Sequence, residues 1–269
     1  MSILQSVLLG LLQGLTEFIP VSSSGHLVIV PWLLNWPSPG LTYDVMVHLG
    51  TLVAVLIHFW EDVVGLARAL WRSLRRRSID TAEARMAWLV LVSMVPGGLV
   101  GGLFSNWLER LFSSPRTAAL FLLVTGVLLV IGERLGRRAR LLQDMRWGDA
   151  LAIGVAQAMA IAPGLSRSGA TISAGLLRGL KRDDATRFSF IMVIPVIAGA
   201  ALAQIWGSSQ GSGSAAGPIH WAIGFAAALL SGYAAIRFLL RYVRMHSLRP
   251  FAYYCWTIAV IVLTLTLVR

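Results

Sequence analysis

Residues 13–26 read Gln-Gly-Leu-Thr-Glu-Phe-Ile-Pro-Val-Ser-Ser-Ser-Gly-His, a polar break inside the long apolar segment 3–34. Pro20 ends a helix because proline lacks an amide hydrogen and its ring clashes with the preceding turn. Each piece beside the break is too short to cross a bilayer, which takes roughly 20 apolar residues per helix. The segment 3–34 therefore predicts a re-entrant hairpin, whose open backbone must face protein or a water-filled cavity.

A second apolar segment, 149–178, is interrupted in the same way. It breaks at 163–169, and its tip, 163–171, reads Pro-Gly-Leu-Ser-Arg-Ser-Gly-Ala-Thr, which predicts a second re-entrant hairpin. A constant offset of 144 residues relates the two segments, and the matched pairs are Gly10 and Gly154, Gln13 and Gln157, Ser22 and Ser166, Ser24 and Ser168, and Gly25 and Gly169. The chain therefore contains an internal repeat.

The composition indicates that lipid surrounds most of the chain. Of 269 residues, 57% are hydrophobic and 13% are charged, whereas a soluble domain carries about 25% charged residues. Six uninterrupted apolar segments predict full spans, at 42–60, 86–104, 117–133, 188–206, 219–240 and 251–268. The predicted fold is an all-α polytopic membrane protein of six transmembrane helices and two re-entrant hairpins, in a single membrane domain over 1–269.

The basic residues set the expected orientation. The net charge is +11, and 19 of the 23 Lys and Arg residues lie in four segments between spans, at 61–85, 134–148, 178–187 and 237–249. With six crossings and two hairpins that do not cross, all four segments fall on one side, which is cytoplasmic by the positive-inside rule. Both termini are then periplasmic or extracellular. This placement also argues against nucleic acid as the partner of the positive charge.

Each half of the chain is a hairpin followed by three spans, over 1–134 and 147–269. Because three is odd, the halves have opposite orientations in the membrane, which makes an inverted-topology repeat. Such repeats place broken helices and the site between them near the midplane. The two hairpin tips are therefore expected to meet.

The first tip carries groups suited to chemistry on phosphate. Ser22, Ser23 and Ser24 can cap a new helix whose free amide groups attract phosphate. Glu17 shares a helix face with Gln13, and a carboxylate at this depth costs at least ~2.5 kcal/mol, so it requires a partner cation, a metal ion or a proton-transfer role. His26, beside Ser23 and Glu17, is a candidate to activate a hydroxyl or to protonate a leaving group.

The second tip carries groups suited to binding. Arg167 has apolar sequence on both sides, and a guanidinium can hold two phosphate oxygens in a fork. Ser166, Ser168 and Thr171 add hydroxyl donors. In the repeat, Ser23 stands opposite Arg167, His26 opposite Ala170 and Glu17 opposite Ile161. The first tip is thus expected to perform chemistry, and the second to hold phosphate.

Other polar residues receive structural interpretations. His48 and His58, inside one span, are interpreted as hydrogen-bonded packing residues. Asp44 opens that span, as a helix cap or as part of the cavity. Cys255 is the only cysteine and is interpreted as a core residue.

The two tips resemble the signature regions of the undecaprenyl-diphosphate phosphatases of the bacitracin-resistance type. The resemblance implies an enzyme of the bacterial cell membrane that removes the terminal phosphate from a C55 isoprenoid diphosphate and returns the monophosphate carrier to cell-wall synthesis. It also implies a homodimer and a divalent cation, Mg²⁺ or Ca²⁺, with unknown ligands to which Glu17 can contribute.

By motif match, the catalytic positions are Glu17, Ser23, His26 and Arg167. The expected substrate-binding positions are Gln13, Ser22, Ser24, Gly25, Gly164, Ser166, Ser168, Gly169 and Thr171. The first carboxylate position of the family accepts Glu or Gln, and here it is Gln13, which weakens any scheme that needs two ionised carboxylates.

Three alternatives to this mechanism and function arise from the sequence. Ser23 can be the nucleophile, or water can be the nucleophile with Glu17 as its base and Ser23 as a ligand. Acid-phosphatase-like lipid phosphatases are excluded because Ser166-Arg167 is followed by Ser-Gly-Ala-Thr without the histidine that they need. A transporter or flippase of an isoprenoid phosphate lipid stays open, since broken helices in an inverted repeat are also transporter architecture.

Overall fold

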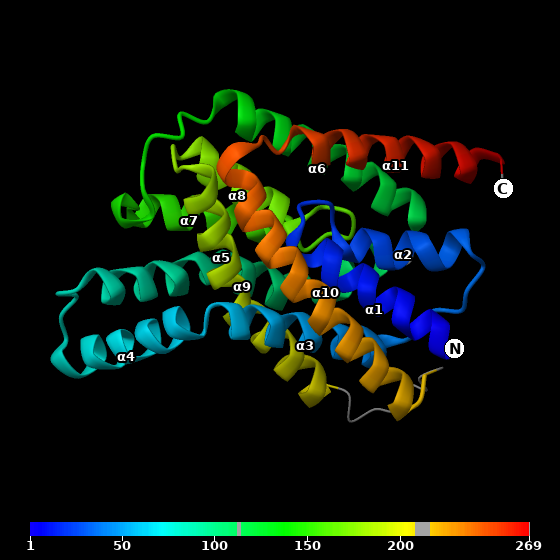
Figure 1. Ribbon diagram of the computed structural model, residues 1–269, viewed down its shortest axis with the longest axis horizontal. Helices are drawn as coiled ribbons and strands as arrows, with labels where there is room; N and C mark the ends of the chain where they lie inside the picture. The colour runs from blue at the N-terminus through cyan, green and yellow to red at the C-terminus, as the bar shows by residue number, and fades with distance from the viewer. Residues whose placement is uncertain (112–113, 208–215, 269) are drawn as a thin grey trace.

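The computed structural model describes residues 1–111, 114–207 and 216–268, and over these residues the regular elements are helical. They are α1 (Ile3–Phe18), α2 (Ser23–Leu33), α3 (Leu41–His58), α4 (Trp60–Arg76), α5 (Ala82–Leu111), α6 (Pro115–Leu135), α7 (Trp147–Met159), α8 (Arg167–Leu177), α9 (Arg182–Gly207), α10 (Pro218–Met245) and α11 (Arg249–Val268), with a short 3-10 turn at Leu142–Asp144. Figure 1 shows them as one bundle of crossing helices.

Six helices in the described part of the chain are long and apolar enough to cross a membrane. They are α3, α5, α6, α9, α10 and α11, and each overlaps one predicted span. The prediction of an all-α polytopic membrane protein is therefore confirmed. The termini lie at one end of the bundle and α4 at the other, as an even number of crossings requires (Figure 1).

The two interrupted segments form pairs of short helices, α1 with α2 and α7 with α8. Their lengths are 16, 11, 13 and 11 residues. At 1.5 Å per residue, even the longest is about 24 Å, short of a hydrocarbon core of roughly 30 Å. These lengths are compatible with two re-entrant hairpins.

The hairpins pack in corresponding ways on the opposite half of the chain. Helix α1 lies against α10, and α7 lies against α5. A Cβ atom at Gly10 would lie 2.5 Å from the carbonyl oxygen of Gly224, and one at the matched Gly154 would lie 2.3 Å from that of Ser93. Both crossings therefore require glycine at the same repeat position, which supports the proposed inverted repeat of 1–134 and 147–269.

Helix α4 was not anticipated, because the basic segment 61–85 was interpreted only as a connection. It is strongly amphipathic, with an exposed arginine face, and it ends at Arg77 in the left-handed conformation with φ 52°. It packs against α5, where Trp88 Nε1 donates to Ser73 Oγ at 2.9 Å.

A buried carboxylate on α6 connects the ends of three helices. Glu133 on α6 accepts two hydrogen bonds of 2.7 Å from Arg182 at the start of α9. It accepts a third, of 3.0 Å, from Arg138, and a fourth, of 2.9 Å, from the amide of Leu248 before α11. One side chain thus holds together the ends of three spans.

Replacing Glu133 with Gln is expected to lower the free energy of unfolding by about 2 kcal/mol. Removing one partner of a buried pair costs roughly 3–5 kcal/mol, and partial exposure of both arginines reduces this. Thermal unfolding in detergent measures the loss. The control is Asp62→Asn, which removes the exposed ion pair with Arg187 and should change stability by under about 0.5 kcal/mol. Equal losses of stability in Glu133→Gln and Asp62→Asn would contradict the conclusion that Glu133 holds the helix ends together.

Candidate functional site

The two hairpin tips meet, as the repeat predicted. A Cβ atom at Gly25 would lie 2.9 Å from the Cα atom of Gly164, so the two backbones touch through glycines. Gly164 itself has φ +91°, which favours glycine, and it packs on the carbonyl of Ala118. Ser168 Oγ donates to the carbonyl oxygen of Ile19 at 3.4 Å. The glycines and serines of the two motifs therefore form one contact region.

Matched serines cap the two helices that begin at the tips. Ser22 Oγ accepts from the amide of Gly25 at 3.2 Å, and Ser166 Oγ accepts from the amide of Gly169 at 3.0 Å. Each capping hydroxyl also lies near a second serine, with 3.4 Å to Ser24 Oγ in the first tip and 3.2 Å between the hydroxyls of Ser166 and Ser168 in the second. Two capped helix N-termini at one place favour an anion.

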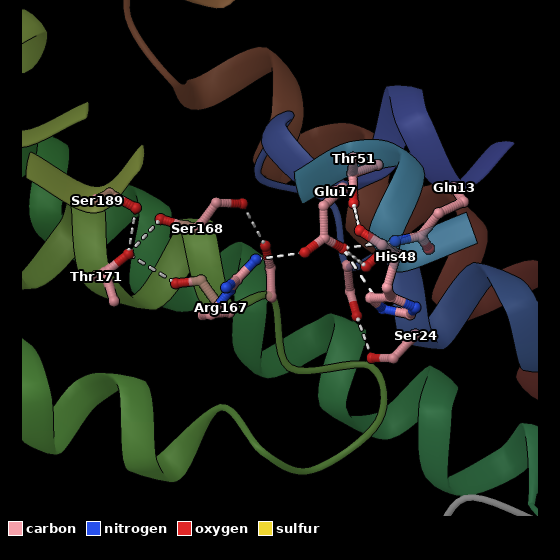
Figure 2. A network of polar contacts seen from close by, with 12 residues as sticks. Gln13, Glu17, Ser24, His48, Thr51, Arg167, Ser168, Thr171 and Ser189 are labelled. Carbon is pink, nitrogen blue, oxygen red and sulfur yellow. Dashed lines mark hydrogen bonds and ion pairs between the residues drawn. The ribbon is translucent and has the colours of Figure 1, made fainter. Parts of the chain in front are cut away.

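Glu17 and Arg167, which have no oppositely charged residue close to them in sequence, are partners. The Arg167 guanidinium donates to Glu17 Oε1, and both side chains are largely buried. Figure 2 shows the Glu17 carboxylate between Arg167 on one side and Gln13 and His48 on the other. The structure therefore supplies the partner cation, one of the three explanations that the sequence left open for Glu17.

The second oxygen of Glu17 faces the rest of the first tip. Ser23 Oγ donates to Glu17 Oε2 at 2.5 Å, and Gln13 Nε2 donates to the same oxygen at 3.0 Å. His48 Nε2 lies 3.9 Å from it. A single carboxylate thus contacts both the candidate nucleophile and the candidate phosphate-binding cation.

His26 makes different contacts from those expected. Its Nδ1 lies 2.7 Å from the carbonyl oxygen of Ser22, and its Nε2 lies 2.8 Å from the hydroxyl of Tyr254 on α11. Both ring nitrogens are therefore engaged by groups other than Ser23 and Glu17. Glu17 is the group that accepts a hydrogen bond from Ser23.

Thr171 points into the packing between α8 and α9. Its hydroxyl lies 2.6 Å from Ser189 Oγ and donates to the carbonyl of Arg167 at 2.8 Å. In Figure 2, Thr171 and Ser189 lie on the side of Arg167 away from Glu17. A contact of Thr171 with substrate stays a prediction.

Three residues at the site were not singled out as functional from the sequence. Thr125 on α6 accepts from the amide of Ser166 and donates to the carbonyl of Gly164, both at 2.9 Å, and so fixes the second tip. His48 was interpreted as a packing residue, and its Nδ1 does bond the carbonyl of Asp44, while its other nitrogen faces Glu17. The third residue is Tyr254, whose hydroxyl contacts His26. The available signal was a polar group inside an apolar span, which other residues of the same spans share.

The implied divalent cation finds few protein ligands. Over the described residues, no group of three or more His, Cys, Asp or Glu side chains is arranged to hold a metal. Gln13 Oε1 is buried beside Glu17 without a hydrogen-bond partner among these residues. One amide oxygen and one carboxylate fit Mg²⁺, which keeps several waters and is commonly bound through one or two carboxylates plus substrate phosphates.

A model of the family described as bacitracin resistance protein BacA matches residues 6–261. The chain therefore belongs to the BacA family.

Proteins named undecaprenyl-diphosphatase are similar over nearly the whole length of both chains. The one from Rubrobacter xylanophilus is 44% identical over 270 residues, 99% of each chain. The one from Pelobacter propionicus is 43% identical over 255 residues, 94% of this chain and 93% of its own. The one from Moorella thermoacetica is 40% identical over 274 residues and covers both chains completely.

Proposed function

We propose that the chain hydrolyses undecaprenyl diphosphate to undecaprenyl phosphate and inorganic phosphate, which returns the lipid carrier to cell-wall synthesis. Membership of the BacA family and the names of its relatives support the substrate. The observation that carries the proposal is the bridging position of Glu17, between the Ser23 hydroxyl and the Arg167 guanidinium at two helix N-termini. Phosphoryl transfer needs this combination of an activated hydroxyl and fixed positive charge.

Substrate binding and activation of Ser23 are coupled through Arg167. The guanidinium that neutralises Glu17 in the free protein is the group best suited to take two oxygens of an incoming phosphate. When Arg167 turns to the diphosphate, Glu17 loses its cation and becomes a stronger base for the Ser23 proton. The nucleophile is therefore activated only when phosphate is present.

The reaction then has two steps. Ser23 Oγ forms a bond to the terminal phosphorus, the bond from that phosphorus to the bridging oxygen breaks, and undecaprenyl phosphate leaves with the electron pair. The proton of Ser23 passes to Glu17. Water next attacks the phosphoserine, Ser23 Oγ leaves and takes its proton back from Glu17, and inorganic phosphate departs. Arg167 and the capped N-termini of α2 and α8 stabilise the charge on the transferring group.

A divalent cation, when bound, neutralises further charge on the diphosphate. Glu17 and Gln13 Oε1 are the protein groups that would hold it. The alternative with water as nucleophile assigns the same residues differently, with Glu17 as the base for water and Ser23 as a ligand.

Release of inorganic phosphate by the purified protein in detergent tests the proposal. Turnover of undecaprenyl diphosphate without a sealed membrane is the expected result, since hydrolysis needs no gradient. A protein that releases no phosphate in detergent, yet moves the lipid between the leaflets of a vesicle, would instead support the transporter or flippase. The homodimer that the family resemblance implies stays a prediction.

We further propose that both termini face outward and α4 faces the cytoplasm. Cys255 is fully buried, so it leaves a low background for thiol labelling. In intact cells, a membrane-impermeant maleimide is expected to label Ser2→Cys, and to label Arg77→Cys only after lysis. The reverse pattern would overturn the orientation inferred from the basic segments.

A further inference from the structure

The two tips differ in one backbone angle. The capping residues Ser22 and Ser166 are repeat equivalents with the same hydrogen bond to the third residue after them, but φ is +71° at Ser22 and −67° at Ser166. A positive φ is uncommon for a residue other than glycine, and it persists only where surrounding contacts hold it. The strained turn directly precedes Ser23, so these contacts also fix the position of the Ser23 hydroxyl.

The contact that holds this turn comes from His26. The carbonyl oxygen of Ser22 accepts from the backbone amide of His26 at 3.2 Å and from the ring Nδ1 of the same residue at 2.7 Å. In the unstrained second tip, the equivalent carbonyl of Ser166 accepts from the amide of Ala170, whose side chain cannot donate. The imidazole is thus present where the turn is strained, and alanine where it is not.

The Ser22 carbonyl determines which nitrogen of His26 carries the hydrogen. A carbonyl oxygen only accepts, so Nδ1 must be the donor, and in the neutral ring Nε2 then accepts from the Tyr254 hydroxyl at 2.8 Å. The two rings are nearly parallel, with 8° between their planes and 5.6 Å between their centroids. By donating to Nε2, Tyr254 therefore stabilises the tautomer and the ring orientation that bond Ser22.

We propose that Tyr254 and His26 are positioning residues, which hold the Ser22 turn so that the Ser23 hydroxyl stays on Glu17. This inference rests on the proposed function and adds Tyr254 on α11, a residue far from both motifs in sequence. It makes Glu17 the base and leaves His26 outside the path of the proton.

Substitution of Tyr254 by Phe keeps the ring and removes only the hydroxyl. The expected result is a kcat about 3- to 10-fold lower with KM little changed, which is the effect of one hydrogen bond. The matched control is Tyr253→Phe, next along α11, whose ring contacts Trp256 and which should keep wild-type turnover. Wild-type kcat in Tyr254→Phe would overturn the proposal.

His26→Asn and His26→Gln separate positioning from acid–base chemistry. The amide of Asn can replace Nδ1 and that of Gln can replace Nε2, so His26→Asn should retain turnover within about 10-fold while His26→Gln loses about 100-fold or more. The pH profile of His26→Asn should keep the wild-type shape. Equal losses in both variants, with one limb of the profile absent, would establish His26 as an acid or base and overturn the proposal.

Relief of the strain supplies a rescue test. Glycine adopts a positive φ without cost, so a background of Ser22→Gly should reduce the fold-loss caused by His26→Ala. An unchanged fold-loss would contradict the strained-turn explanation. Hydrogen exchange of the amides of residues 23–26, measured without substrate, is expected to quicken in Tyr254→Phe and in His26→Gln. Hydrogen exchange does not depend on turnover. Unchanged exchange in both variants would therefore overturn the positioning role without bearing on the proposed function.

Discussion

Ser23→Ala is expected to abolish phosphate release, with kcat lower by at least about three orders of magnitude, because the variant lacks the oxygen that bonds to phosphorus. Binding should be little changed, since Arg167 and the helix N-termini remain. Steady-state phosphate release in detergent measures kcat, and binding of an uncleavable diphosphate analogue measures affinity.

The control for Ser23→Ala is Ser6→Ala in the same hairpin. Ser6 is also buried, and its hydroxyl has no hydrogen-bond partner among the described residues, so its loss should leave turnover near the wild-type value. Residual turnover within about 10-fold of wild type in Ser23→Ala would instead favour water as the nucleophile and leave Ser23 as a ligand.

Arg167→Ala is expected to have two separable effects. Turnover should fall by about three orders of magnitude because the main positive charge for the transferring phosphoryl group is gone. Arg167→Lys should lose less, about 10- to 100-fold, since lysine keeps the charge without the two-pronged geometry. The free energy of unfolding should fall by roughly 3 kcal/mol in Arg167→Ala, because Glu17 is left as an unpaired buried carboxylate.

The double variant Glu17→Gln with Arg167→Ala separates these effects. It removes both charges, so stability should return toward the wild-type value while turnover stays lost. The control is Arg187→Ala, whose ion pair with Asp62 is exposed, and which should keep both stability and turnover. A double variant no more stable than Arg167→Ala would contradict the pairing of Glu17 with Arg167 in the folded protein.

Much of the fold followed from the sequence because lipid imposes simple constraints. Apolar length decides which segments cross, and the broken segments 3–34 and 149–178 were each too short in their parts to do so. The offset of 144 residues then indicated that the two tips meet, and Gly25 does pack on Gly164. Helix α4 was missed because hydropathy alone does not register an amphipathic helix.

The site was less predictable, because its contacts join distant segments. Glu17 and Arg167 were each recognised as buried charges in need of a partner, but their spacing of 150 residues carries no local pattern that pairs them. The contacts of Tyr254 and Thr125 depend on how α11 and α6 pack against the tips. Nor does the sequence around Ser22 and Ser166 reveal that only the first has a positive φ, since this depends on the tertiary contacts of His26.

The most direct test of the account is a structure with undecaprenyl diphosphate whose bridging oxygen is replaced by a methylene group. The expected result places the terminal phosphorus within about 3.5 Å of Ser23 Oγ, as attack requires, with Arg167 turned from Glu17 to the phosphate oxygens. A diphosphate bound beyond the reach of Ser23, with Arg167 still on Glu17, would contradict the claim that the two tips form one phosphoryl-transfer site.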